Sequence, residues 1–391
     1  MISVEEAQSI VAKTSIQPKI ISHSVDSSLC GMTLAEDIIA PMALPPFSQS
    51  AMDGYAVRYH DKSTYDLVGE VQAGSNTTYH LNFGQAVRIF TGAKVPETAN
   101  AVVMQEKVEQ TDDNIEILAP IIIGQSIRPK GGLLKQKDLV FSKGTLVNPA
   151  VIGLLLSLGI DKVFVFQRPT VAIVVTGDEL VPPGQTLEDG QVYESNSCVL
   201  ASALQQLGCS ETELFYSRDN RKATDIALKQ ALKKDLVLIS GGISVGDYDF
   251  VGHSLVGLGV KTLFYKVRQK PGKPLFFGHK DHTPVFALPG NPASTLSCFY
   301  IYVVPLLHRL MGRSSLGLTQ KKLRLAHSYI NKLDRAMFLK AKVVDSKATV
   351  IDELNSASLQ SFANADALIY IDSETKKLEA GSILQAWILP R

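Results

Sequence analysis

The chain has 391 residues, more than one ordinary hydrophobic core organises, so we expect two to four domains. Hydrophobic residues make up 45% and charged residues 20%, and the formal net charge of +1 gives no electrostatic reason to expect nucleic acid or a membrane surface as a partner. No apolar run reaches the roughly 18 residues of a membrane span, so we expect no membrane-embedded segment.

The cysteines and the first residues indicate a cellular compartment. None of the four cysteines forms a Cys-x-x-Cys pair, so the sequence contains neither a zinc ribbon nor a redox motif. Glu5 and Glu6 stand where a secretory signal has basic residues. We therefore expect a cytoplasmic protein whose thiols are reduced.

The first part of the chain combines helical pieces with a β-rich insert. Ser3 and Glu6 form the pattern of a capping box, which predicts a short first helix. Between residues 42 and 129, short β-rich runs such as Tyr65–Val71 are interrupted by turn residues, so we predict a small inserted β domain. Asn148-Pro149 is the pattern of a helix start, with Asn as the N-cap and Pro in the first turn.

From residue 169 to about 314, predicted strands alternate with helices. Val171–Val175 and Leu236–Ile239 are continuous apolar runs, as in strands buried on both faces. The alternation predicts an α/β domain with a parallel, doubly wound sheet. The other elements predicted here are helices at Ser197–Leu207, Lys222–Lys233, Phe250–Leu258 and Ala293–Leu310, and strands at Glu213–Tyr216, Leu275–Phe277 and Val285–Leu288. The last 75 or so residues contain only short β runs and predict a separate C-terminal β domain.

Four loops follow predicted strands of the α/β domain. Ligands of open α/β sheets bind beyond the carboxyl ends of the strands, so these loops should meet at one edge. They are rich in Gly, Ser, Thr and Asp, as a binding edge requires. The loops are Thr176–Leu180, Ser217–Asn220, Ser240–Asp249 and Pro289–Pro292.

The loop that runs from Ser240 to Gly246 carries the strongest binding signal. Gly241 and Gly242 let the backbone adopt positive φ and approach a ligand closely. Ser244 supplies a hydroxyl, and the helix that follows offers free N–H groups to an anion. We predict that this loop holds a phosphorylated ligand, although its spacing is that of neither a Walker A loop nor a Rossmann fingerprint. An ordinary strand-to-helix turn is the alternative.

A rigid basic loop, Lys270-Pro271-Gly272-Lys273-Pro274, precedes the strand at Leu275–Phe277. Its prolines limit the conformational entropy that is lost when Lys270 and Lys273 bind phosphate. A solvated turn with incidental lysines is the competing interpretation.

Several carboxylates fall on the same predicted edge. Because carboxylates repel a bound phosphate, a hard cation such as Mg²⁺ would have to bridge them. Taken singly, each acid is more often a helix cap or a solvated side chain. These acids are Asp178, Glu179, Asp219, Asp247 and Asp249, and the insert adds Asp53.

Two stretches of the insert stand out. Pro45–Val57 contains Phe47 and Met52 at positions that look exposed, and an Asp-Gly turn at Asp53. Phe90–Ala93 has a similar turn-like composition. From the residues alone, both can equally be structural hairpins.

These stretches resemble the molybdopterin molybdenumtransferase family, and the chain is similar also to the C-terminal portion of gephyrin and its plant counterpart. The resemblance covers nearly the whole chain, in the order of the family. The matching stretches are Pro46–Val57, Arg88–Val103, Thr176–Leu180, Val192–Asn196, Ser240–Asp249, Lys270–Pro274 and Leu288–Ser294.

The resemblance implies a multidomain α/β plus β fold. Residues 1–41 and 130–168 would form a discontinuous N-terminal domain, which takes part in dimerisation, and residues 42–129 the β-rich inserted domain. Residues 169–314 would form a three-layer α/β molybdopterin-binding domain, and residues 315–391 a C-terminal β-barrel. The expected active site is shared in a homodimer, between the α/β domain of one subunit and the insert of the other.

The implied activity is the insertion of molybdenum from molybdate into adenylylated molybdopterin, with Mg²⁺-dependent release of AMP. Position by position, Asp53, Thr91, Glu179, Asp219 and Asp249 resemble the catalytic residues of the family, and the last three its metal ligands. The residues of the pterin and phosphate side would be Gly241, Gly242, Ser244, Gly246, Lys270, Lys273, Pro289 and Pro292. No cysteine lies in a matched loop, so we expect no cysteine nucleophile.

Two departures from the family pattern stand out. Gly132-Leu133 replaces a usual Glu-Asp pair, which leaves Asp138 as the next acid, and Glu194 replaces a commoner Asp. Either the missing acid is dispensable or replaced by a neighbour, or the chain is a paralogue with weakened or altered activity.

Two other functions compete with the transferase: a non-catalytic scaffold, as gephyrin also is, and the related adenylyltransferase. The chain has no fusion partner or long linker, which disfavours the scaffold. Its insert and C-terminal β domain disfavour the adenylyltransferase.

Overall fold

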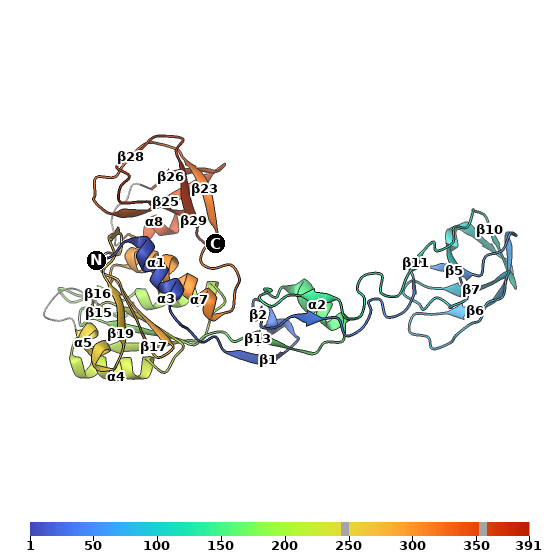
Figure 1. Ribbon diagram of the computed structural model, residues 1–391, viewed down its shortest axis with the longest axis horizontal. Helices are drawn as coiled ribbons and strands as arrows, with labels where there is room; N and C mark the ends of the chain where they lie inside the picture. Colours follow the sequence, from blue (N-terminus) through green and yellow to red (C-terminus); the bar gives the residue numbers. More distant parts are fainter. Residues whose placement is uncertain (244–249, 352–357, 391) are drawn as a thin grey trace.

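The computed structural model describes residues 1–243, 250–351 and 358–390. The molecule is elongated: the α/β unit and the C-terminal barrel lie at one end, a small middle unit follows, and the β insert occupies the other end (Figure 1). In the part of the chain that the structure describes, no helix is long and apolar enough to cross a membrane.

The first helix, α1 (Val4–Lys13), begins at the predicted capping box. The Glu6 amide donates to Ser3 Oγ at 3.1 Å, and the Ser3 amide donates to Glu6 Oε2 at 2.8 Å. The buried face of α1 packs into the core of the α/β unit, whose other residues come much later in the sequence. Arg309 reinforces this contact by donating to the carbonyl of Thr14 at 2.8 Å.

The middle unit is built from segments on both sides of the insert. Its sheet has the order β1-β13-β2, and α2 packs on it through a core that includes Leu34, Leu155 and Val165. The predicted cap of α2 is confirmed, because Asn148 Oδ1 accepts from the Val151 amide at 3.0 Å. The elements here are β1 (Ile20–Ser24), η1 (Ser27–Leu29), β2 (Thr33–Leu34), β3 (Ile38–Ile39), β12 (Leu139–Phe141), α2 (Pro149–Ser157) and β13 (Lys162–Phe166).

The insert is a β structure, as predicted. Its sheet has the order β8-β5-β7-β6-β10-β9, and apolar side chains on its two faces form two separate small cores. A short pair of strands, β4 with β11, joins the insert to the middle unit. The elements are β4 (Gln49–Ser50), β5 (Gly54–Val57), β6 (Thr64–Val71), β7 (Gln85–Ile89), β8 (Ala101–Met104), η2 (Gln105–Lys107), β9 (Val108–Gln110), β10 (Asn114–Ile117) and β11 (Ile127–Arg128).

The α/β unit contains a six-stranded sheet of order β17-β14-β18-β22-β21-β19. Helices α1, α3, α6 (Pro292–Cys298) and α7 (Val304–Leu310) cover one face and α4 and α5 the other, which gives three layers. The predicted central strands are buried on both faces. The strands are β14 (Val171–Thr176), β15 (Leu180–Val181), β16 (Val192–Tyr193), β17 (Thr212–Ser217), β18 (Leu236–Ser240), β19 (Lys261–Tyr265), β20 (Gln269–Lys270), β21 (Phe276–Lys280) and β22 (Thr283–Leu288). The helices are α3 (Asn196–Gln206), α4 (Arg221–Ala231) and α5 (Phe250–Gly257).

The prediction of a wholly parallel sheet is wrong at one edge. β14, β17, β18 and β22 are parallel, but β21 runs antiparallel to both β22 and β19. Only Asp281 and His282 separate β21 from β22, and a connection this short can join antiparallel strands but not parallel ones.

The predicted long helix at Ala293–Leu310 is also modified. The structure has α6 (Pro292–Cys298), a π-helical stretch η3 (Phe299–Val303) and α7 (Val304–Leu310). Pro305 has no backbone N–H to donate, and its ring would clash with the carbonyl four residues earlier in a regular α-helix. The α-helical hydrogen-bond ladder therefore cannot continue through this point.

The C-terminal region is a closed five-stranded barrel, because β25 pairs with both β26 and β27 while β23 and β29 complete the ring. The short helix α8 was not predicted. The elements are β23 (Gln320–Leu325), β24 (Tyr329–Ile330), β25 (Ala336–Val344), β26 (Lys347–Val350), α8 (Leu359–Ala363), β27 (Ala367–Ile371), β28 (Lys377–Leu378) and β29 (Ile383–Ile388). The whole chain is therefore a multidomain α/β plus β protein.

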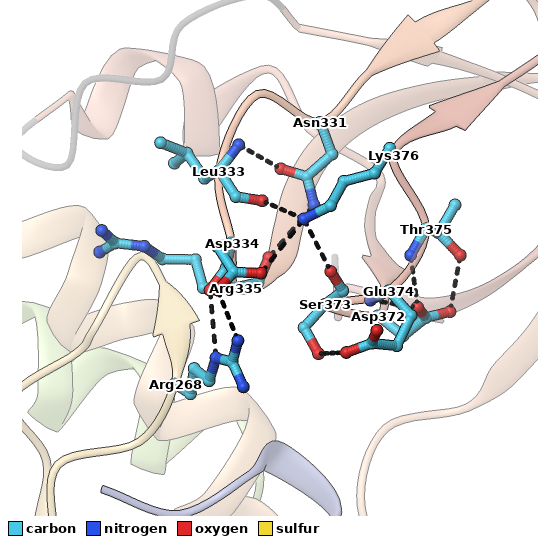
Figure 2. A network of polar contacts seen from close by, with 10 residues as sticks. All are labelled: Arg268, Asn331, Leu333, Asp334, Arg335, Asp372, Ser373, Glu374, Thr375 and Lys376. Atoms are coloured by element: carbon cyan, nitrogen blue, oxygen red, sulfur yellow. Dashed lines mark hydrogen bonds and ion pairs between the residues drawn. The ribbon is translucent and has the colours of Figure 1, made fainter.

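The barrel is joined to the α/β unit beside the predicted basic loop. β20 pairs with β25 in parallel. Next to it, Arg268 contacts Asp334 at 2.6 Å, and Asp334 also contacts Lys376 at 3.2 Å (Figure 2). These side chains are largely exposed, so the ion pairs orient the two units but contribute little to stability.

Replacing Phe277 by alanine is expected to destabilise the protein by about 3–5 kcal/mol, because a fully buried aromatic ring is removed from a packed core. The ring stacks on Phe286 at a centroid distance of 4.4 Å. Chemical denaturation of the α/β unit measures the loss. Ile226→Ala, at an exposed position of α4 in the same unit, is the control and should cost far less.

Candidate active site

The described part of the α/β unit has a cavity of about 570 Å³ at the carboxyl edge of its parallel strands. Residues that follow β14, β17, β18 and β22 line it, so the structure brings the four predicted loops together. The beginning of α3 supplies a further wall. The lining residues with predicted roles are Glu179, Asp219, Gly241, Gly242, Pro289 and Pro292.

Gly241 and Gly242 occupy positions where any added side chain would clash with its surroundings. Their φ angles are +92° and +66°, in the left-handed region that favours glycine. A Cβ on Gly241 would lie 2.6 Å from the Thr176 carbonyl oxygen, and one on Gly242 would lie 2.5 Å from Val251 Cγ2. The backbone can therefore pass close to Thr176 and still open onto the cavity. Ser244 and Gly246, predicted in the same loop, lie outside the described residues.

Glu179 and Asp219 are the predicted metal ligands that lie on the cavity wall. Thr176 Oγ1 donates to Asp219 Oδ1 at 2.5 Å, and the Asp219 amide donates to Asp178 Oδ1 at 3.2 Å, so the position of Asp219 is fixed from two sides. The third predicted ligand, Asp249, lies outside the described residues, as does Asp247. Within the described ranges, no three acidic, histidine or cysteine side chains form a ready metal site.

The loop with Lys270 and Lys273 lies beside the cavity, which it lines only through Pro274. Buried Gln269 organises this loop: its Nε2 donates to the carbonyls of Pro271 and Gly272 at 3.1 and 3.2 Å. The Tyr302 hydroxyl donates to Gln269 Oε1 and holds the amide in place. The shape of the basic loop is therefore set from the core.

Asp53 and Thr91 lie together, but at the far end of the molecule. The hydroxyl and the amide of Thr91 both donate to Asp53 Oδ1, at 2.6 and 2.7 Å. The Thr91 hydroxyl, followed by its amide, lowers the pKa of Asp53 below the usual value, so this exposed carboxylate is ionised at neutral pH. The pair precedes β5 and follows β7 in the insert, while the cavity lies in the α/β unit (Figure 1).

Asn196 is a site residue that the sequence reasoning did not single out. It is nine-tenths buried on the cavity wall, and its Nδ2 donates to Ser240 Oγ at 2.8 Å and to the Gly290 carbonyl at 2.7 Å. One amide thus ties the loop after β18 to the loop after β22. The signal was its place in the matched stretch Val192–Asn196, but the sequence does not reveal which atoms it joins.

Glu194, the milder departure from the family pattern, caps the same helix. Its carboxylate accepts from the amide of Ser197 at 2.9 Å and from the Ser197 hydroxyl. A carboxylate near a helix N-terminus is favourable, so the longer side chain keeps a local structural role.

The four cysteines divide by burial. Cys30 and Cys198 are exposed, and Cys209 and Cys298 are buried. Burial raises the pKa of Cys209 to about 12 and that of Cys298 further, so both remain thiols at neutral pH. Brief alkylation of the native protein, followed by mass spectrometry, should therefore label two thiols, and labelling in denaturant four. A third label under native conditions would contradict this arrangement.

Comparison with known proteins follows the three parts of this architecture. Residues 2–159 match the family described as MoeA N-terminal region (domain I and II), residues 172–309 match a probable molybdopterin binding domain, and residues 322–389 match the MoeA C-terminal region (domain IV). The fold and cavity are thus those of a protein that contains a molybdopterin-binding type of domain.

Relatives that match the chain over its full length identify the family within this class. The chain is 32% identical to the molybdopterin molybdenumtransferase of Staphylococcus epidermidis, over 98% of this chain and 94% of that protein. It is 33% identical to molybdopterin molybdenumtransferase 2 of Mycobacterium tuberculosis over the full length of both. A crystal structure of the molybdopterin biosynthesis moeA protein of Pyrococcus horikoshii superposes with a TM-score of 0.86 at 32% identity, covering 99% of each chain. The protein belongs to the molybdopterin molybdenumtransferase family.

Proposed function

We propose that the protein inserts molybdenum from molybdate into adenylylated molybdopterin and releases AMP. The observation that carries the proposal is the end-to-end relationship to enzymes of that name, in a chain whose α/β unit has a cavity where the family motifs converge. The scaffold and the adenylyltransferase explain this combination less well, because neither accounts for a full-length match to transferases.

The charge of the cavity supports a role for Mg²⁺. Glu179, Glu194 and Asp219 line it, whereas none of the described lining residues is a lysine or an arginine. The charged side chains that a phosphorylated ligand would meet among these lining residues are all negative, so a bridging cation would offset their repulsion. Carboxylate oxygens fit Mg²⁺, which keeps several waters and binds substrate phosphates through one or two carboxylates.

In this proposal Glu179 and Asp219, with Asp249, would hold the cation, whose charge would offset the negative charge that develops on the phosphate as AMP leaves. Backbone N–H groups after Gly241 and Gly242 orient the phosphate. Lys270 and Lys273, beside the cavity, attract the anionic substrates. Pro289 and Pro292 shape the wall against which the pterin lies.

The separation of Asp53 and Thr91 from the cavity supports a homodimer with a shared site. Within one chain the two regions lie at opposite ends of an elongated molecule (Figure 1). A second copy can bring its insert to the cavity, and a two-fold axis would form two such sites. The middle unit presents apolar side chains for such an interface, since Ile20 and Phe164 are 51% and 47% exposed on neighbouring strands.

The enzymatic proposal is tested with purified protein, adenylylated molybdopterin, molybdate and Mg²⁺. We expect AMP release that depends on both molybdate and the divalent cation. Folded protein that releases no AMP in response to molybdate would contradict the transferase function. Size measurement by light scattering tests the dimer separately.

The missing acid gives a further prediction. Leu133 is 77% exposed, and nearby Asp138 accepts from the Lys135 amide at 2.8 Å. We expect Leu133→Asp to change the rate of AMP release by less than about twofold, as for an exposed side chain with little energetic role. A tenfold rise would show instead that the lost acid limits this protein.

A further inference from the structure

We propose that a second cavity, at the junction of the middle unit and the α/β unit, binds a tetrahedral divalent oxyanion. This junction cavity has a volume of about 450 Å³ and is lined by residues of two segments, 143–146 and 308–319. The first segment connects β12 to α2, and the second includes the end of α7 and the connection to the barrel. It is separate from the candidate active site and shares no lining residue with it.

The lining of the junction cavity is cationic and rich in hydroxyls. Lys143 and Arg313 contribute positive charge, and Thr145, Ser314 and Ser315 contribute polar groups. Among the described lining residues there is no carboxylate, and Leu146 is the one large apolar side chain. The His308 imidazole is the one aromatic ring among the described lining residues, and a compact, hydrated anion finds both charge and hydrogen-bond donors there.

Every hydrogen-bond partner that the structure gives the Arg313 side chain is neutral. One terminal nitrogen contacts His308 Nε2 at 3.0 Å, and the other donates to the Leu207 carbonyl at 2.7 Å. His308 Nδ1 lies 3.2 Å from the Ser315 carbonyl oxygen, so Nδ1 carries the proton and Nε2 accepts. Burial, followed by the charge of Arg313, lowers the pKa of His308 to about 4, which keeps the ring neutral.

A second guanidinium reinforces the unbalanced charge. Arg168 donates to the Cys30 carbonyl at 2.9 Å, and its charge adds to burial in lowering the pKa of Arg313. The Nε atoms of both arginines are buried without a partner. Neither arginine takes part in any of the ion pairs found among the described residues. Half-buried positive charges that lack a counter-charge raise the free energy of the folded state, and a bound anion would relieve this.

The position of the cavity gives the anion a structural consequence. Gly144 and Ser314 face each other across the junction, where a Cβ on Gly144 would lie 3.9 Å from Ser314 Cβ. An oxyanion held between Lys143 and Arg313 would contact both units at once. Its binding would therefore stabilise one relative placement of the middle unit and the α/β unit.

The test is thermal unfolding of the full chain in increasing sulfate, with chloride adjusted to constant ionic strength. We expect a saturable rise of the melting temperature, because a ligand that binds the folded state stabilises it by mass action. Lys143→Glu and Arg313→Gln should each weaken the apparent affinity by about tenfold or more, since Arg313→Gln removes a charge-assisted contact and Lys143→Glu replaces one with a repulsive charge. Lys62→Glu, which makes the same charge change on the distant insert, should respond as the wild type does.

Two further arms identify the site and the source of the anion. Lys270→Gln removes a cation of the candidate active site and should keep the sulfate response. The sulfate experiment therefore tests the junction cavity independently of the proposed function. If molybdate raises the melting temperature at lower concentrations than sulfate and phosphate do, the ligand is the metal oxyanion. If the three anions act at equal concentrations, the ligand is an ordinary inorganic anion. The absence of a saturable shift in the wild type, or a shift unchanged in Lys143→Glu, would overturn the proposal. Because the Lys143 side chain is exposed, that variant is decisive even if Arg313→Gln does not fold.

Discussion

Mixing two inactive variants, Asp53→Ala and Asp219→Ala, is expected to restore AMP release. Asp219 lies on the cavity wall, and Asp53 lies with Thr91 at the other end of the same chain. Each single variant should lose about a hundredfold or more in turnover, because without Asp219 the cation that offsets transition-state charge is held less well, and without Asp53 the insert no longer completes the shared site. In a mixed dimer, one site would combine the intact cavity of one chain with the intact insert of the other.

If the two variants associate at random, about a quarter of the wild-type activity should return, because half of the dimers are mixed and each has one intact site. The activity is measured after co-expression or subunit exchange. Asp219→Ala mixed with Glu179→Ala is the control, since both changes affect the same side of the site and no intact combination forms. Recovery in the control, or no recovery in the test pair from dimers shown to be mixed, would refute a site shared in this way.

Gly242→Ala is expected to cause the second large loss of turnover, because it displaces the loop that follows β18. The new Cβ would lie 2.5 Å from Val251 Cγ2 and 2.7 Å from Thr176 Cγ2, at a φ of +66°. The loop has to shift to relieve this clash, which would move the N–H groups that we propose orient the phosphate. A misplacement of about 1 Å can lower turnover roughly a hundredfold.

The measurement compares substrate binding and turnover with thermal stability. We expect a large loss of AMP release with a loss of stability of about 1–3 kcal/mol, the range for backbone strain and overpacking. Gly257→Ala is the matched control: it lies in α5 with no atom within 4 Å of the added Cβ, so activity should be unchanged. Normal turnover of Gly242→Ala would remove the loop from the proposed mechanism.

The sequence predicted those elements that are defined by hydrogen bonds between near neighbours in the chain, or by a long apolar run. The capping box at Ser3 and the cap at Asn148 were recognisable because the bonds span three residues. The strands β14 and β18 were recognisable because burial on both faces demands continuous apolar runs. The convergence of their loops followed from the rule that ligands bind at the carboxyl edge of parallel strands.

Features that depend on distant parts of the chain were not predictable in this way. The antiparallel edge strand β21 was missed, because its direction depends on how it pairs and not on its composition. The packing of α1 against the α/β core joins segments about three hundred residues apart. The clamp by Asn196 was also invisible, since its two partners lie 44 and 94 residues away.

By itself the sequence determined the class of the insert, of the α/β unit and of the C-terminal unit, and it identified the glycines, acids and lysines that could bind phosphate. These features depend on residue type and short-range spacing. The tertiary structure decided which of these groups share a cavity. It placed Glu179, Asp219 and the glycine loop together, and it left Asp53 and Thr91 on a remote unit. It alone brought Lys143 near Arg313 at the junction. The physical reason is that proximity across a fold is set by packing between elements, which no local pattern encodes.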